Sequence, residues 1–204
     1  MNMFVTLETA DLILKSADAR FAENLLQYYL RNKVYLEAYE PKREAAFFTL
    51  AHQETLLEQA MTAADYKAAF RFYCFTKADA QTIIRSIGLS HIEWGNFLSC
   101  SLSYNLDAEH TDKEYITQAM SAVVQYAFQT LFLHRIEANI IPRNISSRRL
   151  LEKCGFVEEG FSPQYLYVNG VWEDYTHMVL LNEALSQPDK RPDGFIERRR
   201  SIDI

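Results

Sequence analysis

The fold of this chain is restricted most by the order in which strand-like and helix-like hydrophobic patterns follow one another along the sequence. The runs that alternate between apolar and polar residues, as strands do, are 4–17, 71–78, 82–94 and 95–106. The runs with the spacing of amphipathic helices are 18–32, 41–70 and 115–132. They are followed by a β-rich run at 134–141, a short helical run at 146–156 and a hairpin pattern at 161–181. This order predicts a mixed α/β domain with one largely antiparallel central sheet flanked by helices.

Residues with strong conformational preferences mark the ends of these elements. Asp18 is predicted to cap the first helix, and Pro41 to occupy the first turn of the second. The pair Asn169–Gly170 predicts a tight turn in the closing hairpin. Apolar periodicity ends near Leu185, which predicts a domain at residues 1–184 and a flexible tail at 185–204.

Composition narrows the class of protein. The chain has 204 residues, of which 49% are hydrophobic, which suits one well-buried domain. Its net charge of −6 does not favour broad contact with a nucleic-acid backbone, so nucleic acid is not an expected partner. Cys74, Cys100 and Cys154 lack the spacing of a zinc site or a disulfide framework, so no metal is expected. Without a long apolar run or a secretion signal, we expect a soluble cytoplasmic protein.

Four short motifs follow one another between His134 and Asp174: HRIEA, PRNISS, LEKCGF and YVNGVWED. Together they resemble the GCN5-related N-acetyltransferase (GNAT) superfamily, in particular the branch typified by RimJ and RimL, the ribosomal-protein N-terminal acetyltransferases. The stretches LETADLIL and IGLSHIEW also look like that branch, so the resemblance covers roughly residues 4–183. It implies the GNAT fold and direct transfer of an acetyl group from acetyl-CoA to a primary amine. The α-amine of a ribosomal protein is one acceptor that it implies.

The resemblance also implies where the pyrophosphate of CoA binds. In the family a Q/R-x-x-G-x-G/A pattern opens a helix whose backbone N–H groups hold the phosphates. Here Glu114 stands in place of the main glycine and Ile116 in place of the second small residue. Backbone donors remain, but close approach to bare backbone is lost, so the motif is degenerate. The residues implied for this part of the site are Thr111, Asp112, Lys113, Glu114, Tyr115, Ile116 and Thr117.

Further residues are implied for the pantetheine arm and the thioester. The strand segment SYNL resembles the family strand that clasps this arm, which assigns Tyr104, Asn105 and Leu106 to the site. Asn144 would bind pantetheine and Ser147 would approach the sulfur. An ordinary paired strand and plain helix capping are the alternative interpretations of these residues.

The general base is left open by the sequence. Glu93, which ends a strand, and Glu137, on a strand covered on both faces, are carboxylate candidates, and His91 has a suitable ordinary pKa. Leu166 stands where some relatives carry a catalytic glutamate, and Leu151 where many carry an acidic tyrosine. The catalytic candidates are Glu93, Ser147 and Glu137.

Two functions follow from this pattern. The first is an acetyl-CoA-dependent N-acetyltransferase acting on a protein N-terminus or a small amine. The second is a catalytically silent protein of the same fold that binds a ligand or partner, suggested by the changed residues at Glu114, Ile116, Leu151 and Leu166. A homodimer is compatible with either function. The basic run at 198–200 is interpreted as a solvated terminus or as a docking segment for ribosomal RNA or an acidic partner.

Overall fold

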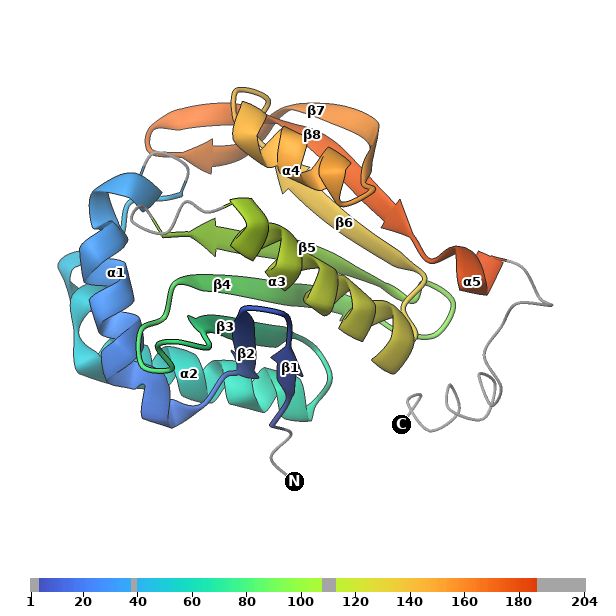
Figure 1. Cartoon of the computed structure of the whole chain (residues 1–204). Coiled ribbons are helices and arrows are strands. Elements are labelled where there is room, and N and C mark those ends of the chain that lie inside the picture. The colour runs from blue at the N-terminus through green and yellow to red at the C-terminus, as the bar shows by residue number, and fades with distance from the viewer. Residues whose placement is uncertain (1–3, 38–39, 108–112, 187–204) are drawn as a thin grey trace.

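The computed structural model describes residues 4–37, 40–107 and 113–186 (Figure 1). Within them one eight-stranded sheet has the strand order β1-β2-β3-β4-β5-β6-β8-β7. Neighbouring strands are antiparallel except for β5 and β6, which are parallel. The strands are β1 Thr6–Glu8, β2 Leu12–Ser16, β3 Phe70–Thr76, β4 Arg85–Glu93, β5 Ser99–Leu106, β6 Arg135–Ile140, β7 Val157–Val168 and β8 Val171–Leu181. The predicted mixed, largely antiparallel architecture is confirmed.

Helices cover both faces of the sheet (Figure 1). They are α1 Ala22–Leu36, α2 Leu50–Asp65, α3 Lys113–Gln125, α4 Ile145–Lys153 and α5 Glu183–Ser186, with short turns η1 Ala19–Phe21, η2 Ala45–Phe48 and η3 Tyr126–Thr130. Side chains alternate along β3, as the pleat of a strand requires. Phe72 and Cys74 pack into the core that contains α3 and α4, whereas Tyr73 and Phe75 pack against α1 and α2. The sheet therefore has two hydrophobic faces, each covered by a pair of helices.

Most of the predicted element ends are confirmed, and one is wrong. Asp18 caps η1 by accepting a hydrogen bond from the backbone N–H of Arg20. Asn169 and Gly170 adopt φ angles of 50° and 94°, as a tight hairpin turn requires. Pro41, in contrast, lies in a loop and not in the first turn of a helix. The helix begins later because Thr49 provides the cap, accepting a hydrogen bond from the backbone of His52.

The described chain continues past the boundary predicted at residue 184. Leu185 in α5 is buried against Phe132, with Leu98 packed on the pair. Residues 187–204, including the basic run at 198–200, lie outside the described residues, so the flexible tail stays a prediction.

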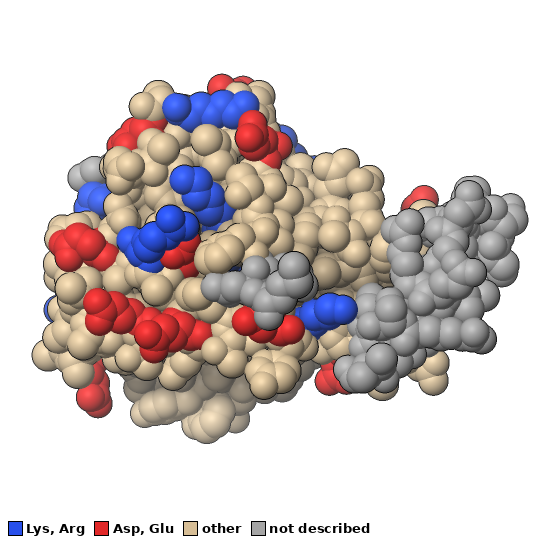
Figure 2. All heavy atoms as spheres, turned by 90° about the horizontal axis from the view of Figure 1, so that it is seen from below, with Lys and Arg blue, Asp and Glu red and all other residues tan. Residues whose placement is uncertain are grey.

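The mixed surface charges and the free cysteine thiols are those of an ordinary globular domain. Figure 2 shows acidic and basic side chains mixed over the face seen from below, with uncharged residues between them. Cys74, Cys100 and Cys154 are free, and burial raises the pKa of the first two to about 12, which keeps these thiols protonated. In the part of the chain that the structure describes, every helix is too short or too polar to cross a bilayer.

The feature that positions the site is the divergence of β5 and β6. These parallel strands pair only from Ser99 to Ser101 on β5 and from Arg135 to Glu137 on β6. Beyond this point each strand keeps its outer neighbour, β4 for β5 and β8 for β6. Both strands therefore stay extended while the space between them widens.

Candidate active site

A cleft of about 380 Å³ opens where β5 and β6 diverge. This volume is in the range of small-molecule binding sites. Its lining comes from the two strands, the start of α4 and the loop after α1, together with side chains from α1, β3 and β8. The lining residues are Tyr29, Glu40, Pro41, Arg43, Arg71, Leu102, Ser103, Tyr104, Asn105, Ala138, Asn139, Ile140, Ile141, Asn144, Ser147 and Tyr175.

Four residues predicted from the sequence meet in this cleft: Tyr104, Asn105, Asn144 and Ser147. The Tyr104 hydroxyl donates a hydrogen bond to Ser147 Oγ over 3.0 Å. Burial raises the pKa of Tyr104 to about 12, although the bond to Ser147 partly opposes this. The phenol therefore carries its proton at neutral pH. Tyr104 and Ser147 form a pair of proton-bearing hydroxyls on one wall of the cleft.

Asn144 combines the two interpretations that the sequence left open. Its Oδ1 accepts hydrogen bonds from the backbone N–H of Ser147 at 3.1 Å and from Ser146 Oγ at 2.9 Å, so it caps α4. Among the described residues, no hydrogen bond uses its Nδ2. Because the residue also lines the cleft, this amide can donate to a bound ligand.

Helix α3 begins at Lys113, and the predicted site residues Thr111 and Asp112 lie outside the described residues. Glu114 is exposed, so water and salt screen its charge. Ile116 is only 5% exposed and belongs to the main hydrophobic core. Tyr115 and Thr117 are half-buried, and Leu106 is the last residue of β5. The Ile116 side chain therefore points into the core and does not cover the end of the helix.

The carboxylates predicted as catalytic lie outside the cleft. Glu93 is exposed and pairs with Ser99, at the closed end of the β5–β6 pair. Glu137 accepts a hydrogen bond from Arg135 Nε at 2.6 Å, and Arg135 also pairs with Glu159. Neither carboxylate is among the described residues that line the cleft.

His91 and the two leucines at altered family positions also lie outside the cleft. His91 is exposed in the bulge between Ser90 and Glu93. Leu151 is completely buried in the core, and Leu166 is exposed on β7.

Glu40 is the carboxylate among the described lining residues, and sequence reasoning missed it. Its side chain is 24% exposed, and its Oε2 lies 3.3 Å from Arg43 Nη2. Burial raises the pKa of Glu40, while the positive charges of Arg43 and Arg71 lower it in part. A carboxylate whose pKa is raised is a stronger proton acceptor than an ordinary glutamate.

The position of Glu40 depends on a residue that is distant in the sequence. Asn169, at the tip of the β7–β8 hairpin, donates through Nδ2 to the carbonyls of Glu37 and Glu40, both at 2.9 Å. Its Oδ1 accepts a hydrogen bond from the backbone N–H of Lys42 at 2.7 Å. The hairpin tip thus holds the loop that carries Glu40 against the cleft. No local pattern around residue 40 indicates this contact.

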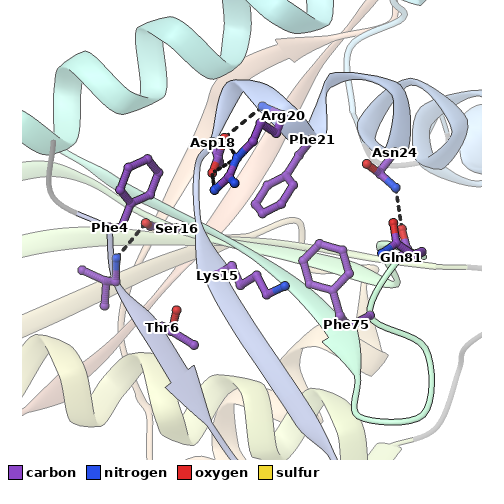
Figure 3. Close-up of a pocket in the computed structure, with 12 residues that line it drawn as sticks. Phe4, Thr6, Lys15, Ser16, Asp18, Arg20, Phe21, Asn24, Phe75 and Gln81 are labelled. Atoms are coloured by element: carbon purple, nitrogen blue, oxygen red, sulfur yellow. Dashed lines mark hydrogen bonds and ion pairs between the residues drawn. The ribbon is translucent and has the colours of Figure 1, made fainter.

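A second hollow, of about 420 Å³, lies beside β1 and β2 and shares no lining residue with the cleft (Figure 3). The Asp18 carboxylate in its wall is already bound by Arg20. Lys15 places its ammonium 5.1 Å from the centre of the Phe75 ring. Its described lining includes the hydroxyls of Thr6 and Ser16, but no hydrogen bond joins them, and Ser16 Oγ already accepts a hydrogen bond from the Val5 backbone. The cleft between β5 and β6 is therefore the site with the groups for acyl transfer.

The cleft therefore holds a carboxylate and a protonated phenol–serine pair, which are the kinds of group that accept and donate protons in group-transfer enzymes. No group of three His, Cys, Asp or Glu side chains within residues 4–37, 40–107 and 113–186 is placed to hold a metal ion.

Comparison with known proteins identifies the family. The model of the acetyltransferase (GNAT) domain matches residues 11–157, which is most of the chain, so the protein belongs to the GNAT acetyltransferase family. The [ribosomal protein uS5]-alanine N-acetyltransferase of Escherichia coli (strain K12) is 31% identical over 188 residues, covering 92% of this chain and 94% of that protein. The chain is an N-acetyltransferase, and the interpretation as a silent binding protein is not retained.

Solved structures agree with this assignment. The ribosomal-protein-S5-alanine acetyltransferase of Vibrio fischeri superposes with a TM-score of 0.84 at 32% identity, covering 92% of this chain and 100% of that chain. The RimJ protein of Mycobacterium smegmatis, solved in complex with CoA-disulfide, has the same fold with a TM-score of 0.80 at 22% identity, over 92% of this chain and 90% of that one.

Proposed function

We propose that the protein transfers the acetyl group of acetyl-CoA to the α-amine of a protein N-terminus, with the N-terminal alanine of ribosomal protein uS5 as the first acceptor to test. The observation that carries this proposal is the similarity, along nearly the whole chain, to two enzymes named for that reaction. Ribosomal proteins are made in the cytoplasm, which is the compartment that this acceptor implies.

The cleft fits the acetyl donor. Beyond Ser101 the β5 backbone is not paired to β6, so its edge is available to the pantetheine arm. Asn144 Nδ2 adds a side-chain donor on the same wall. The start of α3, which follows β5 in the chain, supplies backbone N–H groups and the positive end of a helix dipole for the phosphates.

The side chains of the cleft supply both a base and an acid for this reaction. Glu40 accepts a proton from the acceptor ammonium, and the free amine attacks the thioester carbonyl, forming the C–N bond. When the C–S bond breaks, Ser147 gives its proton to the departing thiolate and Tyr104 supplies a proton to Ser147. The second proton, which the nitrogen loses as the amide forms, passes through solvent to Tyr104 and restores the phenol. General acid and base groups of this kind each contribute about 10²- to 10⁴-fold to the rate.

Release of the CoA thiol in the presence of a peptide with the uS5 N-terminal sequence tests the function. We expect acetylation on the α-amine, located by mass spectrometry. The variant Glu40→Gln should lower kcat/KM by about 10²- to 10⁴-fold, whereas the matched Glu93→Gln should stay within about twofold because Glu93 lies outside the cleft. No acetylation of any N-terminal peptide would overturn the proposal.

The pH profile gives an independent test of Glu40. Because burial raises its pKa, the base becomes protonated as the pH falls through that raised value. The acidic limb of kcat/KM should therefore lie above the ordinary range of a glutamate, and Glu40→Gln should abolish that limb. An acidic limb that is unchanged in the variant would exclude Glu40 as the base.

A further inference from the structure

Arg71 reaches the cleft across a glycine. Arg71 on β3 pairs with Gly88 on β4, and Gly88 pairs with Ser103 on β5, so the three residues lie in a row across the sheet. A Cβ atom at Gly88 would lie 2.8 Å from Arg71 Cζ and 3.0 Å from its Nε. The guanidinium therefore lies against the backbone of β4, in space that only a glycine leaves. From this position it lines the cleft beside Glu40 and Ser103.

The guanidinium of Arg71 is charged and half-buried. Burial raises the pKa of Glu40 and of Tyr29, and the positive charge of Arg71 opposes this rise in part, as expected for a cation close to both. In the described part of the chain, no hydrogen bond or ion pair joins this guanidinium to an acceptor. Arg135 and Arg148, in contrast, are each bound to carboxylates. A half-buried guanidinium that lines the cleft and has no acceptor among the described residues is available to donate hydrogen bonds to the oxygen of a ligand.

The neighbouring charges of Glu40 and Arg71 match a peptide N-terminus. In such a peptide the first carbonyl is attached to the same α-carbon as the amine. A carboxylate can therefore bind the ammonium while an adjacent guanidinium binds the carbonyl oxygen. A polyamine offers no carbonyl and carries further positive charges, which Arg71 and Arg43 in the lining would repel. The cleft thus has groups that distinguish acceptors by the atoms next to their amine.

We infer that Arg71, held across Gly88, binds the first carbonyl of the acceptor peptide and so selects α-amines of polypeptides over polyamines. This inference rests on the proposed function, because it requires a peptide acceptor. Arg71 is then a specificity-determining residue for the acceptor, and binding of the acetyl donor does not depend on it.

Two variants test the inference in different ways. Arg71→Gln removes the charge, and Gly88→Ala keeps the charge but displaces the guanidinium. Both should raise KM for the uS5 peptide about 10- to 100-fold, as expected for loss of a hydrogen bond to a charged group, while kcat changes by less than about threefold. Arg71→Lys should recover part of the loss. Relative to the peptide, spermidine should become a better acceptor in both variants.

Controls separate this inference from folding defects and from the proposed function. Lys77→Ala removes an exposed cation next to Glu8, at the far end of β3, and should leave KM unchanged. The Kd for acetyl-CoA and the Tm of all variants should match the wild-type protein. If the wild-type protein acetylates the peptide but both variants keep its KM within about twofold, the inference is overturned and the function stands. If the wild-type protein acetylates no N-terminal peptide, both are overturned.

Discussion

Asn169 offers the sharpest test of how the cleft is assembled. Its side chain makes three hydrogen bonds to the backbone of the loop that carries Glu40, at 2.7 to 2.9 Å. Exposed hydrogen bonds contribute about 0.5–1 kcal/mol each, at the lower end of the usual range. Their loss should therefore weaken docking of the loop by about 2 kcal/mol. Such a change corresponds to roughly a 30-fold shift in the equilibrium between docked and undocked loop.

The backbone conformation of Asn169 makes a matched pair of variants available. Its φ angle is 50°, which glycine adopts without strain and alanine does not. Asn169→Gly removes the three hydrogen bonds and leaves the turn intact, whereas Asn169→Ala also strains the hairpin by about 1 kcal/mol. We expect both to lower kcat/KM for the uS5 peptide by up to about 30-fold. Only Asn169→Ala should also lower the Tm clearly.

Steady-state kinetics, thermal unfolding and calorimetry of acetyl-CoA binding measure these effects separately. The Kd for acetyl-CoA should stay unchanged, because the hydrogen bonds of Asn169 go to the loop at Glu37, Glu40 and Lys42 and not to α4 or β5. Asn169→Asp keeps the acceptor for the Lys42 N–H but places a carboxylate against two carbonyls, so it should not restore activity. If Asn169→Gly keeps kcat/KM within twofold of the wild-type value, the hairpin does not position Glu40 and the reasoning is refuted.

Two further predictions concern α3 and the hydroxyl pair. Ile116→Ala should lower the free energy of unfolding by about 2–5 kcal/mol, because it leaves a cavity in the core, and it should not improve CoA affinity. Urea unfolding measures the first effect and calorimetry the second. A stable variant that binds CoA more tightly would contradict the packing of Ile116 in the core. Tyr104→Phe and Ser147→Ala should each lower kcat. In the double variant kcat should fall by less than the product of the two single factors, because the residues act through one hydrogen bond. Strictly multiplicative losses of kcat would show that they act independently.

Much of the fold could be predicted because its signals are local. The change of period after β5 indicated α3, and the Asn169–Gly170 pair indicated the hairpin turn that the φ angles confirm. Asn144 and Ser147 could be placed at the start of α4 because capping is a short-range interaction. Tyr104 could be assigned to the cleft, but its hydrogen bond to Ser147 joins elements 43 residues apart and has no local signature.

The proposed general base, Glu40, could not be found in the same way. Glu40 lies in a loop whose position depends on hydrogen bonds to Asn169, 129 residues further along the chain. Glu93 looked suitable because it ends a strand, but the register with β5 places it opposite Ser99, where β5 and β6 are still paired. The sequence indicates that a strand ends at Glu93. Only the strand pairing shows that this end lies where β5 and β6 are still paired, and not where they diverge.

A crystal structure of the protein soaked with acetyl-CoA tests the central claim most directly. The account predicts electron density for the pantetheine arm between Leu102–Asn105 on one side and Ala138–Ile141 on the other, with the sulfur beside Ser147 and the acetyl group facing Glu40. Density for the coenzyme elsewhere on the molecule, or an empty cleft at millimolar acetyl-CoA, would contradict it.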